Sequence, residues 1–239
     1  MKKLFNFNKN SFTIVLPVLN EEKNIKELIL LINKYLKNHI FEIIFVDDNS
    51  SDKTADVIRQ NMTNNVKYFL RKNNRDLTLS CFFGIKNSKY KNIIIMDSDL
   101  QHNPKYLPKM ISLYCKKDYD FLIGTRNFHL DGSLTFVRYF FSKFLIFFYN
   151  LCLKPTLRDP MSGFFIFKKD IYLKNKKNLF GRGFKILADL VYNKHNVSIK
   201  EYLIKFESRK NNNSKMNYTV LLNVLKLLIF KIYFLYIKR

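Results

Sequence analysis

The chain contains few acidic residues, few glycines and no tryptophan. Its 239 residues include 19 Asp and Glu against 42 Lys and Arg, so the formal net charge is +23 and the pI is about 9.8. A shortage of negative charge favours polyanionic partners, namely nucleic acid, anionic lipid or phosphorylated metabolites. The scarcity of glycine and the abundance of Lys, Asn, Ile and Phe also fit an AT-rich genome, which would raise the lysine content without selection for binding. Composition alone leaves both explanations open.

Cysteine is also scarce, and its pattern excludes a metal site or a redox pair built from cysteines. Cys81, Cys115 and Cys152 are an odd number, are widely spaced and stand in apolar surroundings. We therefore expect buried thiols and a reducing compartment.

The sequence lacks a recognisable signal peptide, internal repeat or low-complexity linker. Asn and Lys interrupt the apolar region within the first 22 residues, and no small-residue cleavage site follows. Hydrophobic residues make up 47% of the chain, which is enough for one substantial core. We therefore predict a single domain of ordinary size.

Short apolar runs alternate with segments of helical periodicity. We predict five strands from the apolar runs, at residues 12–16, 41–46, 66–70, 92–96 and 120–124. We predict helices from the segments between them, at residues 21–36, 52–62, 78–88 and 103–117. This order is typical of an α/β fold with a largely parallel sheet and helices on both faces.

Polar residues follow three of the predicted strands directly. The stretches read PVLNEE after the first strand, VDDNSSD after the second and MDSDLQ after the fourth. Ligands of open parallel sheets lie beyond the carboxyl ends of the strands, so we expect the three stretches to meet in one crevice. Each stretch taken alone is also compatible with a helix cap or a solvated turn.

The stretch after the fourth predicted strand indicates a metal site. Asp97 and Asp99 are like charges one residue apart, and their repulsion destabilises the fold unless a positive charge lies between them. Alternate residues after a strand can point the same way, so the two carboxylates could surround one cation, with Gln101 adding a neutral oxygen. Such ligands suit Mg²⁺ or Mn²⁺ and not zinc. We therefore predict a metal ion that binds together with a diphosphate.

Five motifs, in order, resemble those of family-two glycosyltransferases of the GT-A fold. They are TIVLPVLNEEKNI, EIIFVDDNSSDKT, IIIMDSDLQHNP, IGTRN and DPMSGFFIFKK. The resemblance extends from about residue 12 to residue 215 and is greatest to dolichol- and polyprenyl-phosphate mannosyltransferases and polyprenyl-phosphate hexose synthases. It implies a Rossmann-like GT-A domain over residues 1–216, followed by a membrane-associating helix over residues 217–239.

The resemblance also implies which residues hold the donor. Asp97, Ser98 and Asp99 correspond to the metal and diphosphate motif, with Gln101 as a further metal ligand. Arg126 corresponds to a phosphate-binding arginine. The nucleotide would be held at the ends of the first two strands, by Pro17, Leu19, Glu21, Val46 and Asp48.

A late polar loop matches a further motif of the family. The run RKNNNSK contains Arg209 and Lys215, which correspond to basic residues that bind the nucleotide sugar. The run by itself is also typical of a solvated basic turn.

The implied reaction is transfer of a hexose from a nucleotide diphosphate sugar to a polyprenyl or dolichyl phosphate, with inversion. Mannose from GDP-mannose is favoured, and glucose from UDP-glucose is the alternative. The metal acts as a Lewis acid on the leaving diphosphate. A phosphate monoester has a second pKa of about 6, so the acceptor is mostly dianionic near neutral pH and needs no catalytic base. His102, although near the site, is expected behind the ligands or at the surface.

Residues 135–153 indicate a membrane partner. They are more aromatic and apolar than a solvated helix, and the family has an interfacial helix at this place. Arg138 and Ser142 correspond to its residues for the lipid phosphate, and an Arg and a Ser one turn apart can share one helix face. An ordinary core helix is the alternative.

Residues 218–239 form a second apolar stretch. A membrane span needs roughly 20 apolar residues, and each central lysine costs on the order of 3 kcal/mol. Lys226 and Lys231 fall inside the stretch, so a tilted interfacial helix is favoured over a full span. With Lys238 and Arg239, these lysines are predicted to face an anionic surface on the cytoplasmic side of a membrane.

One stretch departs from the pattern of the family. Relatives commonly have a Gly-rich segment before the fourth strand, whereas this chain reads NNRDLTLSCFFG, with Asp76 where Gly is common. We expect this change to alter how Arg75 and its loop meet the donor.

Two other functions are compatible with parts of the sequence. A sugar transferase with a hydroxyl acceptor would need a base, for which Asp159 and Asp189 are candidates. A nucleic-acid-binding protein would use the positive charge, but no recognisable binding motif is present and the charge is interleaved with long apolar helices. We favour the lipid-phosphate hexosyltransferase and predict no nucleic-acid partner.

Overall fold

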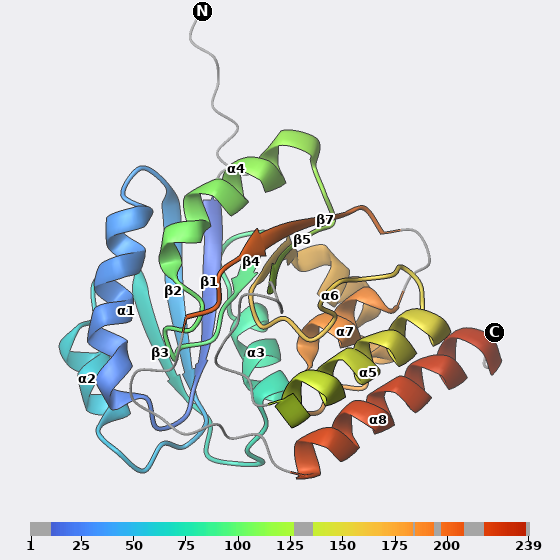
Figure 1. The fold of residues 1–239 in the computed structure, drawn as a ribbon. Coiled ribbons are helices and arrows are strands. Elements are labelled where there is room, and N and C mark those ends of the chain that lie inside the picture. The colour runs from blue at the N-terminus through green and yellow to red at the C-terminus, as the bar shows by residue number, and fades with distance from the viewer. Residues whose placement is uncertain (1–10, 127–135, 184, 194–196, 208–217, 238–239) are drawn as a thin grey trace, which may run out of the picture.

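A seven-stranded sheet forms the centre of the molecule (Figure 1). The structure is a computed structural model, and it describes residues 11–126, 136–183, 185–193, 197–207 and 218–237. The strand order is β3-β2-β1-β4-β6-β5-β7. The strands are β1 (Ser11–Val18), β2 (Ile40–Asp47), β3 (Val66–Leu70), β4 (Asn92–Ile95), β5 (Phe121–Arg126), β6 (Phe165–Lys168) and β7 (Ile199–Ile204).

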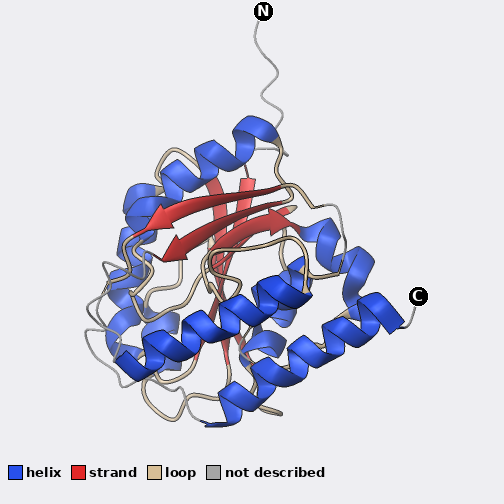
Figure 2. Cartoon of the chain, turned by 45° about the vertical axis from the view of Figure 1, so that its right-hand side comes forward, coloured by secondary structure: helices blue, strands red, loops and turns tan. Residues whose placement is uncertain are grey.

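Helices cover both faces of this sheet (Figure 2). They are α1 (Glu22–Tyr35), α2 (Thr54–Gln60), α3 (Leu77–Lys86), α4 (Leu107–Lys117), α5 (Phe136–Cys152), α6 (Lys169–Asn175), α7 (Ile186–Val191) and α8 (Tyr218–Ile232). A π-helical turn, Tyr233–Ile237, continues α8. The predicted α/β fold class is confirmed.

The sheet is mostly parallel. β1 pairs in parallel with β2 and β4, β2 pairs with β3, and β5 pairs with β7. β6 is the exception, because it is antiparallel to both β4 and β5. β4 and β5 therefore run in the same direction, and the carboxyl ends of β1, β2, β4 and β5 lie at one edge of the sheet. The five predicted strands correspond to β1–β5, and no prediction covered β6 or β7.

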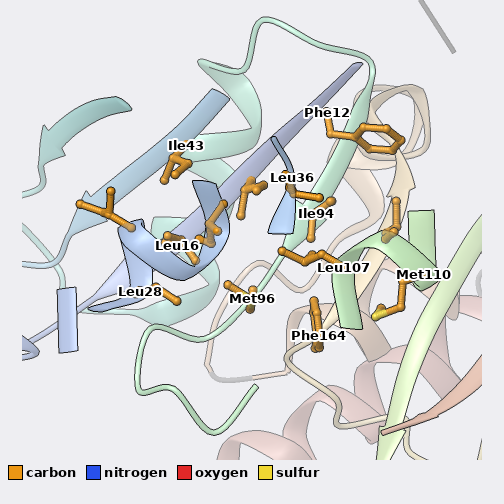
Figure 3. Close-up of a cluster of buried hydrophobic side chains, with 14 of the residues drawn as sticks. Phe12, Leu16, Leu28, Leu36, Ile43, Ile94, Met96, Leu107, Met110 and Phe164 are labelled. Atoms are coloured by element: carbon orange, nitrogen blue, oxygen red, sulfur yellow. The ribbon is translucent and has the colours of Figure 1, made fainter. Parts of the chain in front are cut away.

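The core consists of one cluster of buried hydrophobic side chains on each face of the sheet. Alternate residues of a strand point to opposite faces, so Ile14 and Leu16 of β1 belong to one cluster and Val15 to the other. The first cluster, drawn in Figure 3, packs β1, β2 and β4 against α1 and α4. The second contains residues of α3, α7 and α8. Both faces of the central strands are therefore buried, which explains their continuous apolar sequence.

Helix α8 belongs to this packed structure. It runs beside α5 (Figures 1 and 2), and the hydroxyl of Tyr149 in α5 donates a 2.8 Å hydrogen bond to the carbonyl oxygen of Val224. Val224 and Leu227 are 3% and 2% exposed. No helix in the described part of the chain has both the length and the apolar character needed to cross a membrane.

The prediction that Lys231 faces an anionic surface is wrong. Its side chain is 0% exposed, and its Nζ lies 2.7 Å from Oδ1 of Asp189, which is 2% exposed. Nζ also donates hydrogen bonds to the carbonyl oxygen of Asp189 and to Oδ1 of Asn193. The lysine therefore attaches α8 to α7. The spacing of apolar residues along one helix does not reveal an acidic side chain on another helix. For this reason the sequence suggested a lysine that faces lipid.

Candidate active site

The point at which the strand order reverses lies between β1 and β4. The chain passes from β1 outward to β2 and β3 and returns to β4 on the other side of β1. Ligands of doubly wound sheets bind in the crevice at such a point. Here Oγ of Ser98, just after β4, donates a 3.0 Å hydrogen bond to the carbonyl oxygen of Pro17 in β1. The first and the last of the three predicted stretches are therefore in contact.

The predicted metal ligands form a tight turn after β4. Oδ1 of Asp99 accepts a 3.1 Å hydrogen bond from the backbone N–H of Gln101. Leu100, between them, has a φ of 62°, which is uncommon for a residue with a bulky side chain and occurs where the surrounding structure imposes it. The Asp97 side chain is 35% exposed, whereas Asp99 is 8% exposed. The turn thus leaves Asp97 as the more accessible carboxylate.

Gln101 is attached to the chain that follows β7. Its side-chain Nε2 donates a 3.2 Å hydrogen bond to the backbone carbonyl oxygen of Glu207. The backbone carbonyl oxygen of Gln101 accepts a 3.0 Å hydrogen bond from the N–H of Glu207. The carboxylate of Glu207 in turn lies 3.1 Å from Nζ of Lys105. Oε1 is the acceptor atom of this amide and is therefore the atom that suits a cation.

Asp97 is confined between Gly163 and His102. A Cβ atom added to Gly163 would lie 2.4 Å from Oδ2 of Asp97, so only glycine leaves room for this carboxylate. On the other side, Nδ1 of His102 lies 3.5 Å from the same oxygen. The His102 ring is 2% exposed and contacts the rings of Phe164 and Phe206. The surface position that was one alternative for His102 is therefore wrong.

The surroundings of His102 favour the neutral form of its imidazole. Burial lowers its pKa from 6.5 to about 4, although the carboxylate of Asp99 opposes this shift. A group with this pKa is unprotonated near neutral pH. The histidine thus adds no charge beside the turn that carries the predicted metal ligands.

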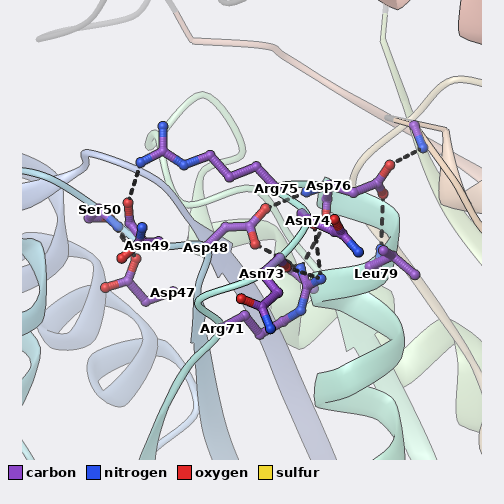
Figure 4. Close-up of polar contacts among 12 residues, drawn as sticks. Asp47, Asp48, Asn49, Ser50, Arg71, Asn73, Asn74, Arg75, Asp76 and Leu79 are labelled. Carbon is purple, nitrogen blue, oxygen red and sulfur yellow. Dashed lines mark hydrogen bonds and ion pairs between the residues drawn. The ribbon is translucent and has the colours of Figure 1, made fainter.

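Asp48, at the end of β2, lies in a network of polar contacts (Figure 4). One carboxylate oxygen lies 2.7 Å from Nη1 of Arg71, and the other accepts a 2.6 Å hydrogen bond from the N–H of Asp76. Burial raises the pKa of Asp48, and the hydrogen bond from Asp76 and the Arg71 guanidinium oppose this shift. Arg75 donates to the carbonyl oxygen of Asn49, 2.7 Å away. The loop after β3 therefore closes over the end of β2.

The other predicted nucleotide residues differ in accessibility. Leu19 is half-buried. Glu21 is 7% exposed, and its Oε2 accepts a 2.7 Å hydrogen bond from Asn24. Val46 is 0% exposed and belongs to the second hydrophobic cluster, so only its backbone could reach a nucleotide.

Arg126, at the end of β5, forms an ion pair with Asp159. Its Nε lies 2.7 Å from Oδ2 of Asp159, a side chain with 0% exposure. Burial alone would raise the pKa of Asp159, but the Arg126 guanidinium, the charge of Lys185 and the hydrogen bond from the N–H of Met161 together lower it. Asp189, the other base considered from the sequence, accepts hydrogen bonds from the N–H groups of Phe180 and Gly181 in addition to its ion pair with Lys231.

The remaining predicted site residues are not described in atomic detail. Arg138 and Ser142 fall within α5, which confirms a helix at this place, but their side chains lie outside the described part of the structure. Arg209 and Lys215 lie outside the described residues, as does the predicted boundary at residue 216.

Three residues of the site were not predicted from the sequence, namely Gly163, Arg71 and Lys185. Gly163 belongs to a recognised motif, but its contact with Asp97 depends on the pairing of β6 with β4. Arg71 gave no signal, because it reaches Asp48 across 23 residues. The pair of Arg126 with Asp159 and the position of Lys185 likewise depend on the tertiary fold.

Within the described ranges, no cluster of three or more His, Cys, Asp or Glu side chains has the arrangement of a metal site. Asp97, Asp99 and Gln101 instead offer two carboxylates and one carboxamide. None of the three cysteines forms a disulfide. The predicted burial holds for Cys81 and is wrong for Cys115 and Cys152, which are half-buried.

Comparison with known families identifies the chain. The model of glycosyl transferase family 2 matches residues 13–175, which include the ends of β1, β2 and β4. The chain belongs to glycosyl transferase family 2. The predicted resemblance and the prediction of a glycosyltransferase are thereby confirmed.

Curated relatives of this family-two glycosyltransferase include dolichol-phosphate mannosyltransferases. The protein from Saccharomyces cerevisiae is 29% identical over 233 residues, which are 90% of this chain and 84% of that protein. The protein from Mycosarcoma maydis is 27% identical, over 92% of this chain and 78% of that protein. The protein from Pyrococcus furiosus is 29% identical over 211 residues, which are 85% of this chain but only 58% of that longer protein.

A solved structure with the same fold is glucosyl-3-phosphoglycerate synthase from Mycobacterium tuberculosis in complex with Mn²⁺ and UDP-glucose. Its TM-score is 0.70 at 15% sequence identity, and the alignment covers 94% of this chain and 78% of that chain. At this level of identity the likeness supports the fold, which agrees with the predicted GT-A architecture.

Proposed function

We propose that this glycosyltransferase transfers mannose from a nucleotide diphosphate sugar, GDP-mannose, to a polyprenyl or dolichyl phosphate. The observation that carries the proposal is that three curated relatives, 27–29% identical over most of the chain, are dolichol-phosphate mannosyltransferases. Glucose from UDP-glucose is the second candidate, supported by the UDP-glucose in the structurally similar synthase. The contact between the ends of β1 and β4 provides a place for the donor.

A divalent metal fits the residues after β4. Asp97, Asp99 and Gln101 supply the oxygen ligands that Mg²⁺ and Mn²⁺ prefer, and the missing side chain at Gly163 leaves room for the Asp97 carboxylate. The structurally similar synthase contains Mn²⁺ with its nucleotide sugar. When bound, such an ion neutralises the charge that develops on the leaving diphosphate.

The chain's own residues would orient the two anionic reactants. In this proposal the carboxylate of Asp48 and the strand end around Leu19 and Glu21 hold the nucleoside. Ser98 attaches the turn of the proposed metal ligands to β1. The acceptor is a phosphate monoester with a second pKa of about 6, so its oxygen attacks the anomeric carbon without a base. The reaction requires no proton acceptor from the protein. This agrees with the low pKa of His102, about 4, and with the pairing of Asp159 with Arg126.

The ion pairs of Asp159 and Asp189 argue against a hydroxyl acceptor. A general base must reach the proton that it removes. Asp159 is fully buried against Arg126, and Asp189 is paired with Lys231 and with two backbone N–H groups. A hydroxyl acceptor would require one of these pairs to break.

Exposed apolar side chains on α5 and α8 support docking to the cytoplasmic surface of a membrane. Phe144, Phe147 and Leu151 of α5 are 53–65% exposed, and Lys143 and Lys226 are exposed on the same two helices. Basic residues near an anionic surface add to apolar insertion. The exposed apolar residues of α8 and of the turn that follows it are Leu222, Leu225, Ile229, Tyr233, Tyr236 and Ile237.

Transfer of a radiolabelled sugar into an organic phase tests the proposed function. The full chain is incubated with labelled GDP-mannose or UDP-glucose, Mn²⁺ and vesicles that contain polyprenyl phosphate. Chloroform-soluble counts that depend on the polyprenyl phosphate are expected with GDP-mannose. Chloroform-soluble counts with UDP-glucose and none with GDP-mannose would show that the donor sugar is glucose. A labelled product that stays in the aqueous phase would contradict a lipid acceptor.

A further inference from the structure

Lys185 is a cation at the candidate active site that none of the motifs includes. It is the N-cap residue of α7, and its side chain is half-buried. The charged groups that act on its ammonium are Arg126, which repels it, and Asp159 and Asp97, which attract it. Lys185 in turn acts on Asp159 and on the buried His102. Its ammonium is therefore within electrostatic range of the turn that carries Asp97 and of the Arg126–Asp159 pair.

The chain just before Lys185 is attached to the start of α3. The N–H of Gly183 donates a 2.6 Å hydrogen bond to Oδ2 of Asp76, and the carbonyl oxygen of Gly183 accepts a 3.0 Å bond from the N–H of Thr78. Gly183 has a φ of 92°, which residues with a side chain rarely adopt. The N–H of Asp76 donates to Asp48. Asp76, the residue that departs from the family pattern, thus joins the end of β2 to the loop that carries Lys185.

In the part of the chain that the structure describes, the ammonium of Lys185 has no ion-pair partner. Among the residues that the structure describes, none forms a hydrogen bond or an ion pair with it, whereas Arg126 is already paired with Asp159 at 2.7 Å. Burial lowers the pKa of Lys185, and the charge of Arg126 acts in the same direction. An anion beside the ammonium would compensate both effects.

We propose that Lys185 binds a phosphate oxygen of the reactants and that Asp76 positions the loop that carries it. This inference rests on the proposed function, because the phosphate belongs either to the donor diphosphate or to the acceptor monoester. Both bring negative charge close to Asp97 and Asp99. An ammonium has three donors and no acceptor, so it suits a phosphate oxygen, and a cation fixed before the reaction stabilises charge without reorganisation.

Binding and kinetics of Lys185→Ala test the proposal. The dissociation constants of GDP and UDP are measured by calorimetry with Mn²⁺, and the KM of a short, water-soluble prenyl phosphate is measured in the transfer assay. A lost hydrogen bond between charged groups weakens binding by about 10- to 100-fold. Weaker nucleotide binding would assign Lys185 to the donor diphosphate, and a higher acceptor KM alone would assign it to the acceptor.

Two control variants make the result interpretable. Lys185→Arg keeps the charge and should retain part of the lost affinity. Lys174→Ala removes an exposed lysine of α6 and should change neither constant. Unchanged constants in a folded Lys185→Ala protein, or in Lys185→Gln if the alanine variant does not fold, would overturn the proposal. Failure of the unaltered protein to bind either nucleotide would instead overturn the proposed function.

A double-mutant cycle separates positioning by Asp76 from a purely structural role. Asp76→Gly removes the acceptor for the N–H of Gly183 and should weaken the same constant that Lys185→Ala weakens. If Asp76 acts through Lys185, its effect should largely disappear in the Lys185→Ala background. Equal effects of Asp76→Gly in both backgrounds would show that Asp76 acts independently of Lys185 and would overturn its positioning role.

Discussion

Removal of the Lys231 ammonium provides a direct test of how α8 is attached to the rest of the protein. Lys231→Met keeps an unbranched side chain of similar length but leaves the Asp189 carboxylate, 2% exposed, without its counterion. Breaking a buried ion pair by removing one partner costs about 3–5 kcal/mol. The total stability of a domain is about 5–15 kcal/mol, so the loss is a large fraction of it.

The expected loss is measurable by thermal unfolding. For a domain of this size, each kcal/mol corresponds to about 2–4 °C, so the midpoint should fall by about 6–20 °C. Circular dichroism at 222 nm and a urea titration of the full chain report this change. The hydrogen bonds from Lys231 to Asn193 and to the carbonyl oxygen of Asp189 are lost as well. We therefore expect the fall in the unfolding midpoint to lie in the upper part of this range.

Lys226→Met is the matched control for this experiment. Lys226 lies on the same helix but is exposed, so its replacement should change stability by less than about 0.5 kcal/mol. Combining Lys231→Met with Asp189→Asn should recover part of the loss, because no buried charge then remains. Equal midpoints for Lys231→Met and Lys226→Met would refute the view that a buried ion pair holds α8 to α7.

Three further predictions concern the metal-binding turn. Asp97→Asn and Asp99→Asn should nearly abolish both sugar transfer and Mn²⁺ binding, which electron paramagnetic resonance measures. Their unfolding midpoints should be unchanged or higher, because each substitution relieves repulsion between the two carboxylates. Full turnover of the unaltered protein in EDTA would contradict this prediction. Gly163→Ala should weaken Mn²⁺ binding, because its Cβ would overlap the Asp97 carboxylate, whereas Gly124→Ala, whose Cβ would face Ile204 and Phe164, should not. The pKa of His102 is lowered by burial to about 4, so the unfolded state binds more protons between pH 4 and 6.5. Stability should therefore fall by about 2 kcal/mol from neutral pH to pH 5, and His102→Gln should reduce this slope in urea titrations.

The strands that could be predicted from the sequence are those whose signal is local. β1, β2 and β4 are short apolar runs that end in polar residues, because both of their faces are covered by helices. β7 is an edge strand with half-buried and exposed positions, so its residues are mixed in character and give a weak signal. β6 is apolar, but its antiparallel place between β4 and β5 depends on segments far away in the chain.

The candidate metal ligands and the candidate nucleotide residues were also proposed from the sequence. Asp97, Asp99 and Gln101 are two residues apart after a strand, and the strand direction alone brings their side chains to the same edge of the sheet. The family resemblance then added the nucleotide and the acceptor. These conclusions depend on spacing within one segment and on the general rule for ligands of parallel sheets.

Tertiary structure decided which charges are available to a ligand. Lys231 and Asp189 are 42 residues apart, and Arg126 and Asp159 are 33 residues apart, so no local pattern connects the partners of either pair. A lysine in an apolar helix has the same sequence signal whether it meets a lipid phosphate or a buried carboxylate. The free energy of a charge depends on its burial and on its neighbours in space, and the packing of α7 and α8 on the sheet sets both.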